Sequence, residues 1–328
     1  MIAASYNNNP AVMAALVKHG APLDGETAES VTPLITAVGK GHLLSLITLL
    51  TMGADPNYET RSGLTALFEA VDRGNLHIVG ELCNQGAMVD YENQYGQRAL
   101  TKAIVQQRAH IVSLLCNHKA DPNVLNLRGK TPLMMACMDN NEDVMAALFY
   151  AGAVVNLETS RGRTALIHAA ENGEADSVEH LVKEGAYPNY ETKNGLTALI
   201  AAAVAGQPES IEALAYCKAN ISYETRKGTT ALIEACRVGS IFSVAALVAL
   251  GAECNYESRV TGRTAMIVAA ESGMVDVIHS LILASASVSH IGRCQRSALQ
   301  EAVACGHQHA AEVLSLAMKE QTGELGVL

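Results

Sequence analysis

The chain has 328 residues and a formal net charge of −10, with 23 basic against 33 acidic side chains. This balance argues against binding to nucleic acid or to an anionic membrane surface, because both need clustered Lys and Arg. Hydrophobic residues make up 49% of the chain but aromatic residues only 4%. The composition therefore excludes a disordered chain and favours many thin layers of small aliphatic side chains over one thick core.

The N-terminus and the longest apolar runs indicate no export or membrane insertion. The first nine residues lack the basic flank and the apolar length of a signal peptide. The runs 43–54 and 241–252 are about a dozen residues long, whereas a membrane span needs about 18 or more. The eight cysteines show no CxxC or zinc-type spacing. We therefore expect a reducing compartment, the cytoplasm or alternatively the nucleus.

A repeated tripeptide, Thr-(Ala/Pro)-Leu or a close variant, organises the chain. Successive copies are 33 residues apart, except for one gap of 34 created by an extra residue in 257–262. A fixed period of this length indicates stacked copies of one supersecondary unit. The copies begin at Thr32, Thr65, Arg98, Thr131, Thr164, Thr197, Thr230, Thr264 and Ser297.

Each unit predicts two helices and an extended segment. The tripeptide begins a short helix, in which Pro33 and Pro132 occupy first-turn positions. A Gly about nine residues later separates this helix from a second one, and Asn140 replaces that Gly in one unit. The second helix ends at a Gly-Ala pair, as at Gly53, and a polar extended segment leads to the next unit.

These features resemble the ankyrin-repeat family over the whole chain. The similarity rests on Gly63-Leu64-Thr65-Ala66-Leu67 with Gly74, on Gly53-Ala54-Asp55-Pro56-Asn57, and on their counterparts. It implies an all-α solenoid of stacked antiparallel helix pairs joined by β-turn fingers. We expect one solenoid over 1–328, with a partial repeat at 1–24, full repeats at 25–318 and a polar tail at 319–328. The family's Thr-x-x-His histidine is replaced here by Ile or Phe, which shifts stability towards apolar packing between neighbours.

The fingers carry a motif that most family members lack. Tyr58-Glu59-Thr60-Arg61 recurs at 190–193 and 223–226, with weaker copies elsewhere. Two interpretations remain open. The tyrosines form an aromatic stripe for a partner, or each Tyr packs on the neighbouring finger while Glu and Arg pair across repeats. We favour packing, although exposed Glu–Arg pairs add little stability, typically under about 1 kcal/mol each.

The repeat beginning at Arg98 and the finger after it depart from the pattern. Gln107 and Lys119 replace the two helix-ending glycines, and the finger 124–127 carries Leu125 and Leu127 in place of charged residues. With Tyr95 and Met138 nearby, the leucines predict an apolar patch of the kind that marks contacts. Sequence drift in a single repeat explains the change equally well.

The sequence offers little that supports catalysis. Gly129-Lys130-Thr131 resembles the end of a phosphate-binding loop, but Val124 stands where its leading Gly belongs. Cys305, His307 and His309 are close in sequence, and a packing role is favoured over metal binding. No nucleophile–base arrangement and no paired carboxylates stand out. We therefore predict no enzyme, no cofactor, no metal site and no small-molecule substrate.

The predicted function is a non-enzymatic scaffold or adaptor that binds a partner protein or peptide along the groove between fingers and first helices. The alternative is a structural ankyrin segment of a larger cytoskeletal, channel or kinase-associated protein. The resemblance indicates which positions face outwards. The hypothesised contacts are Tyr95, Leu125, Leu127, Arg128, Met138, Glu158, Arg161, Glu191, Lys193, Glu224 and Arg226.

The first residues predict an incomplete array. Residues 1–4 align with 134–137, which lie inside a first helix after its anchor. An array needs a terminal unit with a polar outer face, and the half-repeat around 12–16 is apolar. We therefore expect further repeats, another domain or a partner subunit to cover residues 1–20.

Overall fold

The computed structural model describes residues 1–138, 140–293 and 295–322. Within these residues the chain forms twenty helices, α1 to α20, and a single isolated β-bridge between Ile291 and Ser297. The all-α prediction is thus confirmed. Contacts divide the chain into two compact units, Met1–Val154 and Val155–Leu328.

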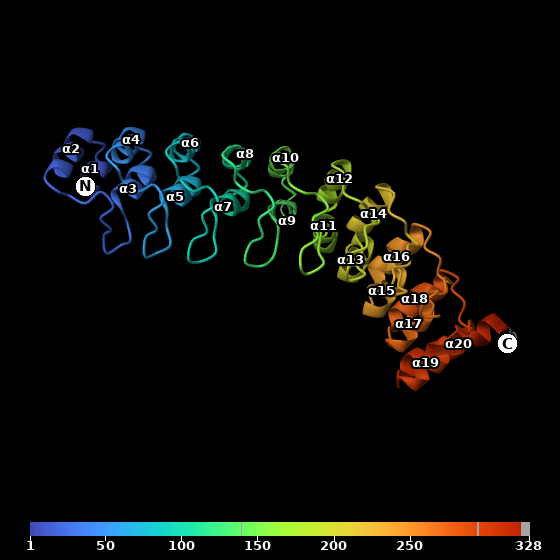
Figure 1. Ribbon diagram of the computed structural model, residues 1–328. Helices are drawn as coiled ribbons and strands as arrows, with labels where there is room; N and C mark the ends of the chain where they lie inside the picture. The colour runs from blue at the N-terminus through green and yellow to red at the C-terminus, as the bar shows by residue number, and fades with distance from the viewer. Residues whose placement is uncertain (139, 294, 323–328) are drawn as a thin grey trace. The chain divides into compact units, whose positions relative to one another are not determined.

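Unit 1 consists of five helix pairs. First helices pack on first helices along the row, and second helices pack behind them. Figure 1 shows the two rows of this unit and the finger loops extending beyond the row of first helices. The first helices are α1 (Ile2–Tyr6), α3 (Pro33–Lys40), α5 (Ala66–Arg73), α7 (Ala99–Val105) and α9 (Pro132–Cys137). The second helices are α2 (Pro10–Lys18), α4 (Leu43–Thr51), α6 (Leu76–Asn84), α8 (Ala109–Asn117) and α10 (Glu142–Tyr150).

Unit 2 repeats the same plan with five further pairs. Its first helices again contact one another in order, and so do its second helices. The first helices are α11 (Ala165–Asn172), α13 (Ala198–Ala205), α15 (Ala231–Val238), α17 (Ala265–Glu271) and α19 (Ala298–Ala304). The second helices are α12 (Ala175–Lys183), α14 (Pro208–Tyr216), α16 (Ile241–Ala249), α18 (Val275–Leu283) and α20 (Gln308–Thr322).

The repeated threonine begins each first helix by capping it. The Thr197 hydroxyl accepts a hydrogen bond from the Ile200 amide at 3.2 Å, and the side chain is buried. Such a bond satisfies one of the amides that a helix N-terminus leaves without an intrahelical partner. The same bond forms at Thr32, Thr65, Thr131, Thr164, Thr230, Thr264 and Ser297.

Arg98 occupies the cap position of α7 without an acceptor atom in its side chain. Its guanidinium instead forms an ion pair with Glu92 at 2.5 Å, and its main-chain amide donates to the Thr101 hydroxyl at 3.3 Å. The α7 N-terminus therefore lacks the cap that the other full repeats share.

The residue between the two helices of a pair adopts a left-handed conformation. Gly74 has φ of +73°, and Gln107 and Asn140 take the same conformation with φ of +57° and +47° where the glycine is missing. Side chains rarely adopt this region because the Cβ atom crowds the following carbonyl. The sequence departures at 107 and 140 therefore leave the backbone path unchanged.

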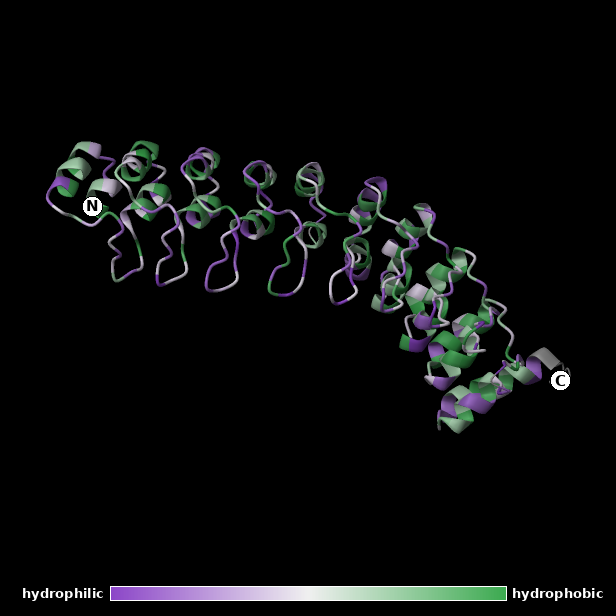
Figure 2. Cartoon of the chain, viewed as in Figure 1, coloured by the Kyte–Doolittle hydropathy of each residue, from purple (hydrophilic) through white to green (hydrophobic). Residues whose placement is uncertain are grey.

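Buried residues recur at the same positions of successive repeats, so the core is a stack of thin layers. One column in the first helices is alanine, from Ala37 through Ala70 and Ala103 to Ala302, and it is almost completely buried. A second column in the second helices is leucine, from Leu49 through Leu82 to Leu314, and it is fully buried. Figure 2 shows the resulting green faces on the helices and largely purple and white finger loops. Small side chains let neighbouring helices approach closely, which accounts for the few aromatic residues.

The two ends differ from the sequence-based boundaries in detail. The residues 1–24 form the helix pair α1 and α2, which pack on α3 and α4 respectively. At the other end α20 continues to Thr322, so the first four residues of the expected polar tail are helical. The rest of that tail, 323–328, lies outside the described residues.

We expect the cap positions to differ in their contribution to stability. Replacing Thr197 by Ala removes a buried side-chain acceptor and should lower the free energy of unfolding by about 1 kcal/mol. The matched variant Arg98→Ala removes only a partly exposed ion pair and should cost less than about 1 kcal/mol. Urea unfolding followed by circular dichroism measures both. Equal losses at the two positions would contradict the capping role.

Candidate functional site

Most fingers close on a tight turn of the same geometry, and the finger at 257–263 has one more residue in its turn. In the finger before α5 the Thr60 amide donates to the Leu64 carbonyl at 3.0 Å, and the Gly63 amide donates to the Thr60 carbonyl at 2.8 Å. Gly63 has φ of +75°, a conformation that favours glycine. Since the turn repeats, equivalent side chains of successive fingers lie next to one another.

Finger glutamates join neighbouring fingers. The Glu191 carboxylate accepts hydrogen bonds from the Tyr223 hydroxyl and from the Arg226 amide of the next finger, both at 3.1 Å. We call this arrangement a carboxylate bridge. It is also formed by Glu26 with Tyr58, Glu59 with Tyr91, Glu158 with Tyr190 and Glu224 with Tyr256, and Glu257 forms it with His290.

These bridges favour the packing interpretation of the Tyr-Glu-Thr-Arg motif. The side chain of Glu191 is only 7% exposed, and Arg226 adds an ion pair to the same carboxylate at 3.0 Å. Five tyrosine hydroxyls donate to a carboxylate of the preceding finger. The aromatic slot of the motif is thus committed to contacts within the chain.

The bridges shift the protonation equilibria of both partners. Burial acts to raise the pKa of Glu224, but hydrogen bonds from Tyr256, Ser258 and two main-chain amides outweigh it and hold that pKa below its ordinary value of 4.5. The Tyr256 hydroxyl donates to this carboxylate and is partly buried, and both effects raise the pKa of Tyr256 above 10.0. The bridge is therefore most stable when Glu is ionised and Tyr is protonated.

The bridges are interrupted in the second half of unit 1. The Glu92 carboxylate accepts hydrogen bonds from Arg98 of its own repeat, at 3.0 Å from Nε. In the next finger Val124 stands in the tyrosine slot and Leu125 in the glutamate slot. The bridge from the Glu92 position and the bridge from the Leu125 position to the following fingers are therefore missing.

A groove of about 610 Å³ lies where the bridges are interrupted. It is bounded by the fingers before α7 and α9 and by residues of α5, α7 and α9. Its apolar side chains are Phe68, Tyr95, Val105, Leu127, Met135 and Met138. Its polar lining consists of Gln97, Thr101, Lys102, Asn126, Arg128 and Lys130.

Two side chains of the groove rest on glycines of the preceding fingers. A Cβ atom added to Gly63 would lie 2.6 Å from the Tyr95 ring, and one added to Gly96 would lie 2.3 Å from a Leu127 methyl group. These contacts leave much of both side chains accessible, since Tyr95 is 56% and Leu127 74% exposed. The glycines therefore seat the two side chains at the tips without burying them.

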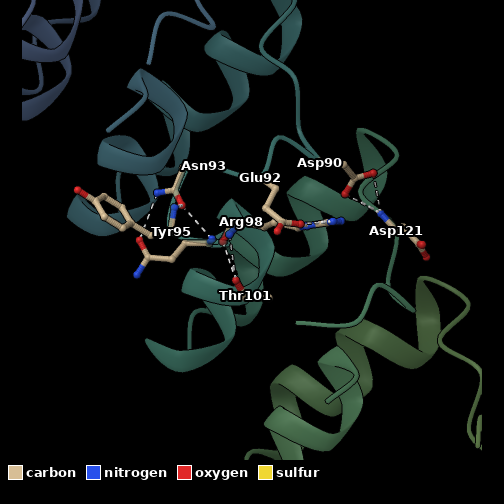
Figure 3. A network of polar contacts seen from close by, with 8 residues as sticks. Asp90, Glu92, Asn93, Tyr95, Arg98, Thr101 and Asp121 are labelled. Atoms are coloured by element: carbon tan, nitrogen blue, oxygen red, sulfur yellow. Dashed lines mark hydrogen bonds and ion pairs between the residues drawn. The ribbon is translucent and has the colours of Figure 1, made fainter. Parts of the chain in front are cut away.

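Buried Asn93 orients the finger that carries Tyr95. Its side-chain amide donates to the Gly63 carbonyl of the preceding finger at 2.8 Å, and its side-chain oxygen accepts from the Tyr95 amide at 3.1 Å and the Gln97 amide at 2.9 Å. Figure 3 shows Asn93 and Tyr95 next to the Glu92–Arg98 pair and the Thr101 hydroxyl. A side chain with both donor and acceptor groups thus fixes the turn and the start of the groove.

Basic side chains line the polar part of the groove. Lys102 forms an ion pair with Asp72 at 2.5 Å, and its ammonium nitrogen lies 5.4 Å from the centre of the Phe68 ring. Hydrogen bonding from Lys102 is the main cause that lowers the pKa of Asp72. Arg128 is exposed at the finger tip, and the Lys130 ammonium group lies 3.1 Å from the Met138 sulfur.

The structure brings together four of the residues that the sequence predicted as partner contacts, namely Tyr95, Leu127, Arg128 and Met138. Leu125 is exposed in the same finger but lies outside the described lining of the groove. The remaining predicted contacts lie in the fingers of unit 2. There Glu158, Glu191 and Glu224 are the acceptors of carboxylate bridges, Lys193 and Arg226 supply amides to them, and Arg161 is exposed at a finger tip.

Most of the groove lining was not among the contacts predicted from the sequence. Phe68, Lys102, Lys130 and Met135 belong to its lining and were not predicted as contacts. The sequence could have indicated Phe68, because it is the single aromatic residue at the Thr-x-x-His position of the full repeats. Arg108 was missed as well: its guanidinium donates to the carbonyls of Val71 and Asp72 and so caps the C-terminus of α5.

Two of the residues considered for metal binding form polar contacts within the chain, and the third, Cys305, is exposed. His307 lies 2.9 Å from the Glu271 carbonyl, and His309 lies 3.4 Å from the Glu312 carboxylate. Over 1–138, 140–293 and 295–322, no group of three His, Cys, Asp or Glu side chains is placed to hold a metal ion. Burial raises the pKa of the Cys83 and Cys116 thiols to about 11.

None of the described helices combines the length and the apolar character needed to span a membrane.

Comparisons with known proteins agree on the repeats. A family model described as ankyrin repeats (3 copies) matches residues 43–126, 118–192 and 176–258. Among solved structures, a crystal structure of the human ASB11 ankyrin repeat domain is similar with a TM-score of 0.57 and 27% sequence identity. The match covers 67% of this chain and 98% of that one. No curated protein matches the sequence.

We expect the carboxylate bridge to give a characteristic dependence of stability on pH. Tyr256→Phe removes the 2.7 Å bond to Glu224 and should lower the free energy of unfolding by about 1 kcal/mol near neutral pH. The contribution of Glu224 is present above pH 4.5 and is lost as the pH falls through its lowered pKa. That of Tyr256 is present below pH 10.0 and is lost as the pH rises through its raised pKa.

The difference in the free energy of unfolding between wild type and Tyr256→Phe should therefore be largest between pH 4.5 and pH 10.0. It should become smaller at lower and at higher pH. Urea unfolding at a series of pH values measures it. Tyr216→Phe is the matched control, because Tyr216 is 79% exposed at the end of α14. A loss for Tyr256→Phe that is independent of pH would show that its hydroxyl does not act through the carboxylate.

Proposed function

The chain belongs to the ankyrin-repeat family, and on this basis we propose that it is a scaffold or adaptor that holds a partner protein or peptide in the groove of unit 1. Ankyrin repeats generally act as protein–protein interaction modules and are typically not catalytic. The proposal is accordingly non-enzymatic, with no cofactor, no small-molecule substrate, no nucleic acid and no membrane insertion.

One observation carries the proposal. Exposed apolar side chains gather in the groove at the place where the carboxylate bridges are interrupted. Tyr95, Val105 and Leu127 are each more than half exposed, which is costly in water unless a partner covers them. Tyrosine and methionine are also side chains that suit a binding surface, since both offer a large contact area and Met adapts its shape.

The remaining predicted contacts are proposed as additional contacts outside the groove. Arg161, Lys193 and Arg226 have exposed side chains at finger tips of unit 2 and are available to an extended partner. Glu158, Glu191 and Glu224 contribute less directly, because their carboxylates hold the fingers in place. Leu125 is proposed as a rim contact beside the groove.

A structural role in a larger multidomain protein is the second candidate. The uninterrupted carboxylate bridges of unit 2, from Glu158 to Glu257, favour it because they tie every successive finger to the next. We place the protein in the cytoplasm or the nucleus. This location is supported by the seven cysteines within the described residues, which are all free thiols.

We expect Leu127→Asp to abolish partner capture. The change would bury an unpaired carboxylate against an apolar partner surface and should reduce capture at least tenfold. Because Leu127 is 74% exposed, the melting temperature should change little. The measurement is affinity capture from cell extract with quantitative mass spectrometry of the bound proteins.

The matched control is Tyr150→Asp, which places the same charge at a 93% exposed position on α10 of the same unit. Proteins that bind through the groove should be lost with Leu127→Asp and retained with Tyr150→Asp. Identical sets of captured proteins for wild type and Leu127→Asp would contradict the groove as the binding site. A large drop in melting temperature for Leu127→Asp would show that Leu127 is a packing residue instead.

A further inference from the structure

Helix α16 of unit 2 has an unusual composition for a helix at the surface. Every residue of Ile241–Ala249 is apolar except Ser243, which is buried. One face of the helix packs into the layers, and the opposite face carries Phe242, Ala245 and Ala249 at helical spacing. Phe242 is 75% exposed, and both alanines are exposed as well. A helix that is apolar all round is normally buried, so we expect the outward face of α16 to have a partner.

The apolar face continues onto the neighbouring second helices. α14, α16 and α18 contact one another in order, so equivalent positions lie side by side. Tyr216 of α14 and Leu283 of α18 occupy the position that Ala249 has in α16, and both are more exposed than Phe242. We call the surface formed by Phe242, Ala245, Ala249, Tyr216 and Leu283 the α16 patch. Its members gather on three packed helices, whereas ordinary exposed apolar residues are scattered singly.

Carboxylates border the α16 patch on two sides. Glu209 of α14 and Asp276 of α18 occupy the position of Phe242, and Glu212 lies one turn further along α14. All three side chains are exposed. None of them forms an ion pair within the part of unit 2 that the structure describes. Phe242 therefore lies between uncompensated negative charges on both neighbouring helices.

Basic groups are few around the α16 patch. His279 is exposed on α18, and the exposed Lys218 follows the C-terminal end of α14. A second copy of the same surface would bring more carboxylates than basic groups, so it complements this charge poorly. An anionic lipid surface would be repelled. The charge is complemented by a partner whose basic side chains lie next to apolar ones.

The same helix position in unit 1 lacks this combination. Leu44 of α4 is equivalent to Phe242 and is also exposed. The equivalent positions of α2 and α6 carry Ala11 and His77 in place of carboxylates. The pairing of an exposed apolar side chain with flanking carboxylates is thus a property of α14, α16 and α18, and α4 supplies a matched control.

We propose that the α16 patch binds an amphipathic helix of a partner protein whose apolar stripe is bordered by Lys or Arg. A helix is about 10–12 Å wide and packed helices lie about 8–10 Å apart, so a helix lying along α16 reaches both of its neighbours. Its apolar stripe covers Phe242 and Ala245, and the small alanine allows close approach. Its basic borders face Glu209 and Glu212 on one side and Asp276 on the other. This site is independent of the function proposed for the groove of unit 1.

The experiment uses the full chain and a phage-displayed library of helical peptides with one randomised side. We expect the enriched peptides to carry Leu, Met, Phe or Trp along one stripe and Lys or Arg on both borders of it. A synthetic copy of an enriched peptide is then titrated by fluorescence anisotropy. Phe242→Ala should weaken its binding at least tenfold, because a central aromatic contact is lost.

A second variant tests the charges without changing the apolar surface. Glu209→Gln combined with Asp276→Asn should weaken peptide binding about fivefold at low salt, since two exposed ion pairs are removed. Added salt should reduce the difference between this variant and wild type, because it screens those pairs. Replacing the peptide's Lys or Arg by Gln should reproduce the loss.

The matched controls make the same changes in unit 1. Leu44→Ala truncates an exposed apolar side chain at the same helix position, and Asp143→Asn removes an exposed carboxylate at that position of α10. Leu127→Asp alters the groove. All three should leave the affinity for the peptide unchanged, and no variant should change the melting temperature much because every altered side chain is exposed.

Several outcomes would overturn the inference. These are a library that yields no helical peptide, enriched peptides without basic residues, and an affinity that Phe242→Ala leaves unchanged. A dimer in sedimentation velocity that Phe242→Ala dissociates would show that a second copy covers the patch instead. Peptides whose binding is lost with Leu127→Asp and kept with Phe242→Ala would overturn the α16 patch and leave the groove of unit 1 standing.

Discussion

Packing between neighbouring repeats is the interaction on which the rest of the structure depends. A single helix pair of this chain has no interior, and its apolar side chains become buried only against the pairs before and after it. The alanine column around Ala70 and the leucine column around Leu82 are the result, because each position must fit the same position one repeat away. This requirement explains why the chain is rich in small aliphatic residues and poor in aromatic ones.

The fingers depend on hydrogen bonds instead of apolar packing, because they lie outside these apolar layers. Their main-chain turns expose amides that need acceptors, and the finger glutamates supply one from the preceding repeat. The tyrosine hydroxyl donates a further hydrogen bond to the same carboxylate. Where Arg98 holds Glu92 and where Leu125 replaces a glutamate, the tips are left with apolar side chains that the chain itself does not cover. The groove and the interrupted bridges are thus two aspects of one local change.

The parts of the structure that follow from local chemistry could be predicted from the sequence. A Thr before Ala or Pro and a Gly at a fixed distance predict where each first helix begins and ends, and both positions are confirmed at Thr197 and Gly206 of α13. The apolar finger at 124–127 also predicted part of the groove. What could not be predicted were contacts between residues about one repeat apart, such as Glu191 with Tyr223 or Arg108 with the end of α5. They depend on the direction in which a side chain leaves its finger or helix, and spacing alone does not determine that direction.

The tyrosines have an optical consequence. The chain contains no Trp and only ten Tyr, so phenol rings supply most of its near-ultraviolet absorption and nearly all of its intrinsic emission. Five of these rings donate a hydrogen bond to a glutamate of the preceding finger. Light emitted by the protein therefore reports in part on the fingers, while far-ultraviolet dichroism reports on the helices. The same molecule carries separate spectroscopic probes for its tips and for its layers, without any added label.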